Sequence, residues 1–244
     1  FLEISPLAAY DSDYAIGGGC VAGIGVISGV ECVIFGNDPT VLAGALTHYA
    51  SKKWGRCIEI ARENGIPYIS FVESAGADLR INPMSKEKPW NIGTGHFAET
   101  GRWFYEMTEL SKMRIPTIAV VFGSSTAGGA YQPGMSDYNI FIKEQSKVFL
   151  AGPPLVKMAT GEESDDETLG GAQMHSEVSG LSDYLAEDEM DALRICREVV
   201  SHLNWKKAEE DPQLRSESPA YDSEELLGLV SPDLKTPFDI KEAI

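Results

Sequence analysis

Apolar residues along the chain alternate between short, nearly continuous runs and longer stretches in which they recur every three or four positions. Continuous runs are typical of buried strands, and the wider spacing is typical of helices with one buried face. Glycine and proline mark the turns between them. The pattern predicts an α/β fold. Its expected strands cover residues 19–28, 30–37, 67–73, 116–122, 138–142 and 148–151, and its expected helices cover residues 46–64, 96–113 and 187–204, with a brief helix from Pro153.

Two of the predicted helices have distinct apolar stripes. In the first helix, apolar residues recur at spacings of three and four, which predicts a single buried face. The second helix has a wider stripe. The first stripe consists of Leu46, Ala50, Trp54, Cys57 and Ala61, and the second of Phe97, Gly101, Phe104 and Thr108, widened by Trp103, Met107 and Leu110.

Two segments of the chain, 65–77 and 114–130, follow the same plan. Each follows a predicted helix, enters a strand through Ile-Pro, and leaves it in a loop of glycine, alanine, serine and threonine. A supersecondary unit repeated in this way predicts stacked ββα turns that form a spiral. Two repeats alone leave a chance resemblance between the segments open.

The second of these loops, Gly123–Ala130, is rich in small residues, which let a backbone come close to a ligand. If Gly128 and Gly129 open a short helix, its free N–H groups can hold the developing negative charge of a carbonyl oxygen. The loop 74–77 offers further backbone donors at the end of another strand. Two donors on one oxygen are what a thioester enolate requires. Tight strand-to-helix turns without a ligand would use the same residues, and the pattern leaves both interpretations open.

Nucleophilic and metal-dependent chemistry fit the sequence less well. The segment Gly-Ser-Ser-Thr-Ala, residues 123–127, lacks the closing glycine of a nucleophile elbow. No histidine has a spacing that ties it to this loop. His175 lies in a predicted loop, and its role stays open. The acidic run 162–167 does not have the spacing of a calcium loop. We therefore predict no metal site and disfavour a serine hydrolase.

The chain is acidic, with a formal net charge of -17. A protein that binds nucleic acid or an anionic membrane needs a basic surface. The longest weakly polar run, 16–27, is too short to span a bilayer, and no signal-peptide pattern opens the chain. We therefore expect neither nucleic acid nor a membrane as a partner. Lys52, Lys53 and Arg56 form a local basic spot that either meets ligand phosphates or is the solvated face of its helix, and we favour the solvated face.

The four cysteines lie far apart, without paired metal-ligand spacing, and three of them fall inside apolar patterns. This predicts buried free thiols in a reducing, intracellular setting. Because the chain begins with Phe1 and not with methionine, we also expect further sequence upstream.

The segment Gly-Ser-Ser-Thr-Ala-Gly-Gly-Ala-Tyr, residues 123–131, with Pro133 and Met-Ser-Asp at 135–137, resembles the glycine-rich signature of carboxyltransferase β subunits. These subunits belong to the propionyl-CoA and methylcrotonyl-CoA carboxylase group. Residues 149–162 match a second block of the family almost residue for residue. Further matches follow in the right order to residues 221–225, so the resemblance covers nearly the whole chain.

The resemblance implies a crotonase-like (ClpP/crotonase) ββα spiral that forms a single domain over residues 1–208. Residues 209–244 would be a linker or docking segment toward a missing second carboxyltransferase domain. The first domain of such subunits binds acyl-CoA, and its enolate takes up carbon dioxide released from carboxybiotin. The implied partners are a biotin-carrying α subunit, which uses ATP and bicarbonate, and other β subunits. The implied location is the cytoplasm, or the mitochondrial matrix in a eukaryote.

By position in the motif, Gly128 and Gly129 match the acyl-side oxyanion hole of the family and are the expected catalytic residues. Ala75 replaces a glycine of the family, and Asp78-Leu79 intervene before Arg80, so the donor in that loop stays open. Ser125, Gln132 and Gly134 replace the cysteine, valine and alanine of the methylcrotonyl type in or beside the acyl pocket, and Gly134 would admit a longer chain if it faces the ligand. The expected substrate-binding residues are Ser74, Ala75, Gly76, Ala77, Thr126, Ala127 and Ala130.

Two other functions are compatible with such a fold. An enoyl-CoA hydratase or isomerase would need one or two carboxylates beside the glycine loop, and Glu73 is the nearest in sequence. A non-catalytic assembly subunit would have lost the chemistry, and the intact segment 127–130 speaks against that. We therefore expect a carboxyltransferase, in which Gly129→Val blocks carboxylation and leaves the fold largely intact.

Overall fold

The computed structural model describes residues 1–78 and 94–206, with the side chains of 94–100 left out, and a number of positions between 222 and 241. Residues 1–207 form one compact unit and residues 208–244 form a second. The described strands all belong to the first unit. In the second unit, the described element is a 3₁₀ helix, η4, over Ser223–Gly228.

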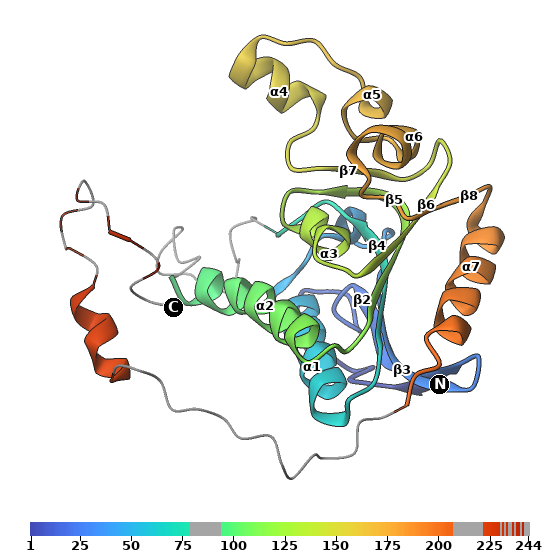
Figure 1. Cartoon of the computed structure of the whole chain (residues 1–244), viewed down its shortest axis with the longest axis horizontal. Helices are drawn as coiled ribbons and strands as arrows, with labels where there is room; N and C mark the ends of the chain where they lie inside the picture. Colours follow the sequence, from blue (N-terminus) through green and yellow to red (C-terminus); the bar gives the residue numbers. More distant parts are fainter. Residues whose placement is uncertain are drawn as a thin grey trace. The chain divides into compact units, whose positions relative to one another are not determined.

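A mixed sheet organises the first unit (Figure 1). The described strands follow the order β1-β2-β3-β4-β5-β6-β8, and β7 pairs with the end of β5. The first three strands are antiparallel, and the pairs from β3 onward are parallel. The bounds are β1 Leu2–Glu3, β2 Cys20–Ile27, β3 Val30–Asn37, β4 Tyr68–Ser74, β5 Thr117–Thr126, β6 Tyr138–Ile142, β7 Lys147–Phe149 and β8 Tyr184–Ala186.

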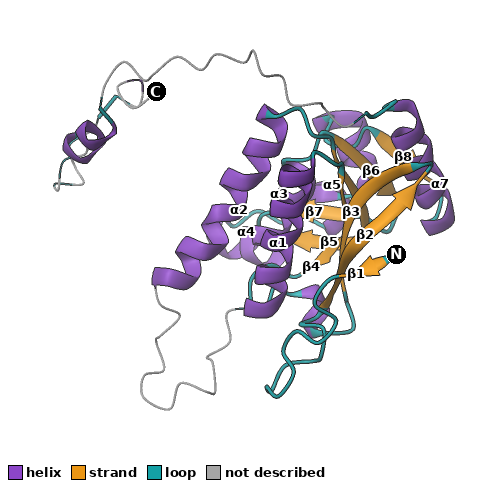
Figure 2. Cartoon of the chain, turned by 90° about the horizontal axis from the view of Figure 1, so that it is seen from below, coloured by secondary structure: helices purple, strands orange, loops and turns teal. Residues whose placement is uncertain are grey.

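Helices cover both faces of this sheet: α1 and α2 lie on one face and α7 on the other (Figures 1 and 2). Among the described residues, no helix combines the length and the apolar character needed to cross a membrane. The α-helices are α1 His48–Asn64, α2 Thr94–Lys112, α3 Tyr131–Gly134, α4 Pro153–Thr160, α5 Asp166–Gly170, α6 Ala172–Met174 and α7 Glu189–His202. Two 3₁₀ helices, η1 Leu42–Gly44 and η2 Ala127–Ala130, and a π-helix, η3 His175–Ser179, complete the unit.

Local sequence explains the hairpin and the first helix, both of which were predicted. Ser28 and Gly29, between β2 and β3, have φ values of 49° and 83°, as the two-residue turn of a twisted hairpin requires. The Thr47 hydroxyl caps α1 by accepting a hydrogen bond from the Ala50 N–H. Gly65 ends the helix in the left-handed conformation, with φ 59°.

Two apolar cores lie on the two faces of the sheet. The face of α1 and α2 buries Phe35 and Tyr68 against Trp54, and the face of α7 buries Ile69 and Ile118 with that helix. The first predicted stripe is confirmed from Ala50 to Ala61, whose residues are buried on one face of α1; Leu46 is buried too but precedes the helix and forms a bridge with Ala77. The strands are apolar on both faces because each face is covered.

The predicted stripe of α2 was wrong in part. Trp103, Met107 and Leu110 form the buried side, whereas Gly101 and Thr108 are exposed. A Cβ atom at Gly55 of α1 would lie 2.9 Å from the Trp103 Nε1, so glycine is what lets the two helices pack this closely. Phe97 lies outside the described side chains.

The strand β5 continues further than its apolar run predicts. Gly123–Thr126, expected to be loop, extend the strand, and Ser124–Thr126 pair with β7; only Ala127–Ala130 leave it. At Gly123 the absence of a side chain leaves room for the Glu73 carboxylate: a Cβ atom there would lie 2.6 Å from the Glu73 Oε1. The pattern of small residues therefore marks close strand packing as well as a turn.

Candidate functional site

The two small-residue loops meet at the carboxyl end of the parallel strands. Ser74 at the end of β4 is paired with Ser125 of β5. Gly76, just beyond, has a φ of +89°, and a Cβ atom there would lie 3.1 Å from both the Ala127 Cβ and the Thr126 carbonyl oxygen. A glycine at this position lets the loops touch, since a larger residue would push them apart. The structure thus brings the segments 74–77 and 126–130 together.

The turn Ala127–Ala130 presents main-chain donors. It is a 3₁₀ helix, whose i→i+3 bonds leave the first N–H groups, those of Ala127 and Gly128, without an intrahelical acceptor. The Thr126 side chain does not cap them. A Cβ atom at Gly128 would meet no described atom within 4 Å. Gly128 therefore combines an N–H group free of helical bonding with open space beside it.

Gly129 has a different environment. It is buried, and a Cβ atom there would lie 2.8 Å from the Ser74 Cβ and 3.2 Å from the Ser125 Oγ. The i→i+3 pattern also directs its N–H group to the Thr126 carbonyl. Gly129 packs the turn against the ends of β4 and β5. The expectation that Gly129→Val leaves the fold intact is therefore wrong, because a valine would overlap Ser74.

In the loop 74–77, most main-chain donors already have acceptors. The Ala75 N–H donates to the Ala43 carbonyl at 3.0 Å, and the Gly76 N–H donates to the Ser74 Oγ at 3.2 Å. Ala77 forms a parallel bridge with Leu46, and its N–H has no acceptor among the described residues. Ala77 is therefore the available donor of this loop. Leu79 and Arg80, which made the donor ambiguous in the sequence, lie outside the described residues.

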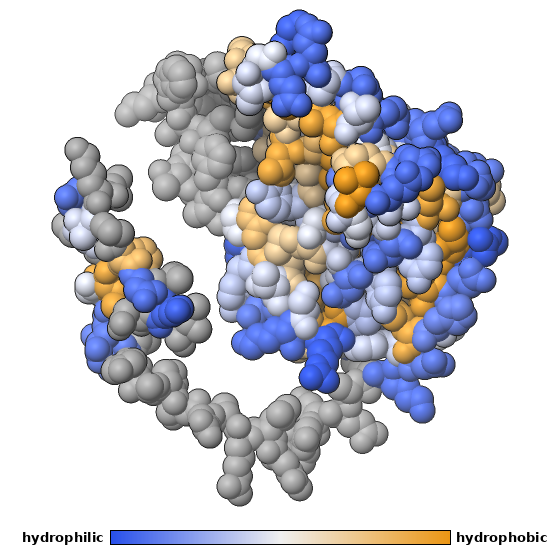
Figure 3. Space-filling model, turned by 45° about the horizontal axis from the view of Figure 1, so that its top comes forward, coloured by the Kyte–Doolittle hydropathy of each residue, from blue (hydrophilic) through white to orange (hydrophobic). Residues whose placement is uncertain are grey.

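An apolar groove of about 580 Å³ begins at the turn. Figure 3 shows a broad apolar area in the upper centre of the molecule, as expected where such side chains line an open groove. Gly134 lines the groove, and a Cβ atom there would meet no described atom within 4 Å. The lining residues are Phe104, Ala130, Tyr131, Gly134, Met135, Val148, Phe149, Leu150, His175 and Leu181.

Sequence reasoning missed most of these lining residues. Phe149 and Leu150 were treated as part of a short strand and a family block, yet Leu150 is 62% exposed. An apolar pair at the end of a strand, followed by Ala-Gly-Pro-Pro, is the signal that could have suggested a ligand-facing edge. Tyr131 packs edge-on against Phe104 of α2, with ring centroids 4.8 Å apart, and closes one side of the groove.

Ser125 and Gln132, the two other positions at which this chain differs from the methylcrotonyl type, do not line the groove. Ser125 and Gln132 are 0% and 1% exposed, and among the described residues neither side chain has a hydrogen-bond partner. Ser125 lies directly behind Gly129. Of the three positions that differ from the methylcrotonyl type, Gly134 is the one that faces the groove.

Glu73, the carboxylate nearest in sequence, points away from the turn. Neighbouring residues of a strand face opposite sides of the sheet, so Glu73 and Ser74 diverge. The Glu73 carboxylate packs on Gly123, and its pKa is raised by burial and by the nearby carboxylate of Glu189 on α7. Glu73 thus belongs to the face of the sheet that α7 covers.

The three basic residues of α1 do not form one patch. Lys53 is buried and donates to the carbonyls of Gly17 and Cys20, at 3.1 and 2.9 Å. Arg56 pairs with Glu59 at 2.6 Å, while Lys52 is exposed. The favoured interpretation, a solvated helix face, was therefore wrong for Lys53, whose long stem carries its charge to loop carbonyls.

The four cysteines are buried free thiols, as predicted. Burial raises the pKa of Cys20 to about 11 and that of Cys32 to about 12. Such thiols stay protonated at neutral pH and are poor nucleophiles. Within the described part of the chain, no group of three or more His, Cys, Asp and Glu residues is placed to hold a metal ion.

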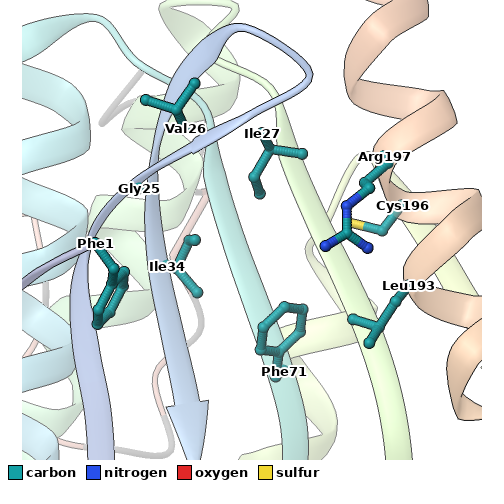
Figure 4. Close-up of a pocket in the computed structure, with 9 residues that line it drawn as sticks. All are labelled: Phe1, Gly25, Val26, Ile27, Ile34, Phe71, Leu193, Cys196 and Arg197. Carbon is teal, nitrogen blue, oxygen red and sulfur yellow. The ribbon is translucent and has the colours of Figure 1, made fainter.

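A second, smaller groove of about 310 Å³ lies between α7 and the outer face of β2, β3 and β4 (Figure 4). Its lining is apolar apart from Arg197, and includes Ile34 and Phe71 of the sheet and Leu193 of α7. The residues of the two loops do not contribute to it. The larger groove is therefore the one joined to the main-chain donors.

Over residues 1–244, the sequence matches the family described as the carboxyl transferase domain. It is 57% identical over 244 residues to a probable biotin-dependent acyl-coenzyme A carboxylase beta2 subunit of Mycobacterium tuberculosis, covering 100% of this chain and 44% of that protein. It is 44% identical to the mitochondrial methylcrotonoyl-CoA carboxylase beta chain of Dictyostelium discoideum, of which it covers 41%.

Solved structures show the same relationship. The crystal structure of the beta subunit of Pseudomonas aeruginosa geranyl-CoA carboxylase has a TM-score of 0.73 and 42% identity, covering 99% of this chain and 43% of that one. The transcarboxylase 12S structure has a TM-score of 0.73 at 26% identity, and covers 99% of this chain and 46% of that one. The crotonase-like α/β fold is thereby confirmed. The chain spans less than half the length of these relatives.

Proposed function

Because the chain belongs to the carboxyl transferase domain family, we propose that it is the acyl-CoA-binding half of the β subunit of a biotin-dependent acyl-CoA carboxylase. Relatives that bear this name are more than twice as long, so the activity of the whole protein is part of the proposal. The observation that carries it is the contact between two loops whose available main-chain N–H groups include those of Gly128 and Ala77.

These two N–H groups would bind the carbonyl oxygen of the acyl-CoA thioester. When the α-carbon loses a proton, negative charge moves onto that oxygen, and fixed donors stabilise it more than they stabilise the neutral thioester. The other expected site residues then have supporting roles: Gly76 lets the loops meet, Gly129 packs on Ser74, and Ala127 shapes the turn. Ala130 begins the wall of the groove.

Glu73 lies on the α7 face of the sheet, and both ring nitrogens of His175 are already hydrogen-bonded, which suits a reaction whose proton acceptor comes from another component. Carboxybiotin, carried on a partner subunit, supplies the carboxyl group when it is bound. The resemblance assigns the use of ATP and bicarbonate to that partner, and it suggests assembly with further β subunits. Transcarboxylase 12S, at 26% identity, is described as a hexamer, which supports an oligomeric state here.

A structure of the full-length subunit with butyryl-CoA would test the site directly. We expect the thioester oxygen within about 3 Å of the Gly128 and Ala77 nitrogens, the usual distance for an N–H donor. A thioester carbonyl directed elsewhere, with both N–H groups facing solvent, would contradict the proposal.

The acyl chain would lie in the apolar groove that begins at Ala130. The groove is about 580 Å³ and almost free of polar groups, and Gly134 leaves it wide. Burying each methylene of an acyl chain contributes about 0.8 kcal/mol, so a groove of this kind favours chains longer than that of propionyl-CoA. We therefore propose a medium-length or branched acyl-CoA as substrate.

Filling the groove should remove this preference. Gly134→Phe is expected to weaken binding of octanoyl-CoA to the full-length subunit by about tenfold or more, since several buried methylenes would lose their place. Binding of butyryl-CoA should change little. Calorimetric titration measures both. Gly101→Phe, on an exposed position of α2, is the matched control and should bind both thioesters as the unmodified protein does. Equal losses for the two thioesters would place the acyl chain elsewhere.

The hydratase or isomerase alternative is not favoured, because Glu73 lies on the α7 face of the sheet. We expect Glu73→Gln to leave carboxylation unchanged. The raised pKa means that the folded state disfavours the charged carboxylate, so wild-type stability falls as pH rises through that pKa. The variant should therefore gain unfolding temperature at pH 8 and less at pH 5. Lost activity in this variant would revive the alternative.

A further inference from the structure

His175 is buried at the edge of the groove and both of its ring nitrogens are bonded. The Nε2 is 2.8 Å from the Val148 carbonyl oxygen, and the Nδ1 is 2.7 Å from the Ser179 Oγ. A carbonyl only accepts, so the hydrogen bonds assign the proton to Nε2, and Nδ1 accepts from the Ser179 hydroxyl. The ring also packs beside Phe141, with centroids 5.4 Å apart. The imidazole is therefore fixed in orientation.

Ser179 extends this chain of hydrogen bonds. Its Oγ accepts a hydrogen bond from the Leu181 N–H at 3.2 Å. His175 and Ser179 are the two ends of the π-helix η3, and Gly180, with a φ of +72°, turns the chain toward Leu181. A short π-helical segment of this kind often marks a functional position. A continuous path of polar contacts thus runs from Val148 through the ring to Leu181.

Both ends of the path line the groove. Val148 belongs to β7, whose Phe149 pairs with Thr126 immediately before the glycine turn. Leu181 lines the groove from the segment that follows η3. The ring of His175 lies in the lining between them. The His175 and Ser179 hydrogen bonds therefore connect these two parts of the wall, which also pack in one apolar cluster.

We propose that His175 is a positioning residue that sets the width of the groove and so selects the acyl chain, a role that rests on the function proposed above. The imidazole holds β7 and Leu181 at a fixed spacing through Val148 and Ser179. Without it, the wall relaxes and the contact with a long chain is lost. A short chain, held mainly at the turn, depends on it much less.

The test uses the full-length subunit, with octanoyl-CoA and butyryl-CoA titrated by calorimetry. His175→Phe keeps an aromatic ring and loses both hydrogen bonds. It should weaken the binding of octanoyl-CoA by about tenfold and the binding of butyryl-CoA by less than about twofold. His175→Gln has an amide that can donate to Val148 and accept from Ser179, and should restore most of the preference. Ser179→Ala should lower the preference for octanoyl-CoA over butyryl-CoA by about threefold.

Ser201→Ala is the matched control, since the Ser201 hydroxyl bonds within α7 to the Glu198 carbonyl. It should change neither affinity. If the wild-type subunit binds neither thioester, the proposed function and this inference both fail. If the wild type binds both, and the His175 and Ser179 variants either keep the preference or lose both thioesters equally with lower unfolding temperatures, the inference alone is overturned.

Discussion

Gly128→Val is expected to lower acyl-CoA carboxylation by about a hundredfold or more, the loss seen when one oxyanion donor fails, and to leave the unfolding temperature unchanged. The position has open space where the valine side chain would go, so the fold has no reason to change. That space is where the thioester oxygen must approach the Gly128 N–H. The measurement is the rate with the assembled enzyme, together with thermal unfolding of the subunit.

Gly101→Val serves as the comparison for Gly128→Val, since it adds the same side chain at an exposed helical glycine. Its rate should equal that of the wild type. A Gly128→Val enzyme that is stable and fully active would remove the turn from the mechanism. A Gly128→Val enzyme that unfolds would instead show that the open space is absent in solution.

Gly129→Val is expected to destabilise the subunit by about 3 kcal/mol, the upper range for overpacking a core position. A Cβ atom there would already lie 2.8 Å from the Ser74 Cβ, and strand backbone cannot move away easily. Denaturant unfolding measures the loss. Removing the obstructing side chain should relieve part of it, so the double variant Gly129→Val/Ser74→Gly should be more stable than Gly129→Val alone.

The double variant also provides the contrary outcome. If the two substitutions destabilise additively, Ser74 and Gly129 do not press on each other, and the packing role assigned to Gly129 is wrong. The comparison also needs the single variant Ser74→Gly. Activity would fall in both single variants and in the double variant, so the unfolding free energy, and not the rate, decides this point.

Much of the fold was predictable because its strands and helices have clear periodicity. The run at Tyr68–Ser74 and the stripe through Trp54 and Cys57 are buried as their spacing indicates. The errors have physical causes. Gly123–Thr126 contain too few apolar residues to look like a strand, yet Ser124–Thr126 pair with β7, and Gly123 leaves room for the Glu73 carboxylate.

The candidate site was predictable in position and less so in detail. The loops at Gly76 and Gly128 share one edge because they follow neighbouring parallel strands, and the order of the strands suffices to predict that. The difference between Gly128 and Gly129 is not in the sequence, since both are glycine. It arises from the i→i+3 bonding of η2 and from the position of Ser74, which are tertiary features. The groove was missed because its lining comes from five separate segments.

The touching loops at Gly76 and Ala127 have a consequence for how this protein tolerates change. Every residue type except proline carries the same amide N–H, so exchanging charge, aromaticity or polarity does not delete the chemical group. What substitutions alter is bulk and backbone angle. At the alanine and serine positions of these loops, a saturation library should therefore rank variants by side-chain volume, with serine and alanine tolerated together and aspartate and leucine rejected together. Gly76 and Gly129 should accept none of these side chains.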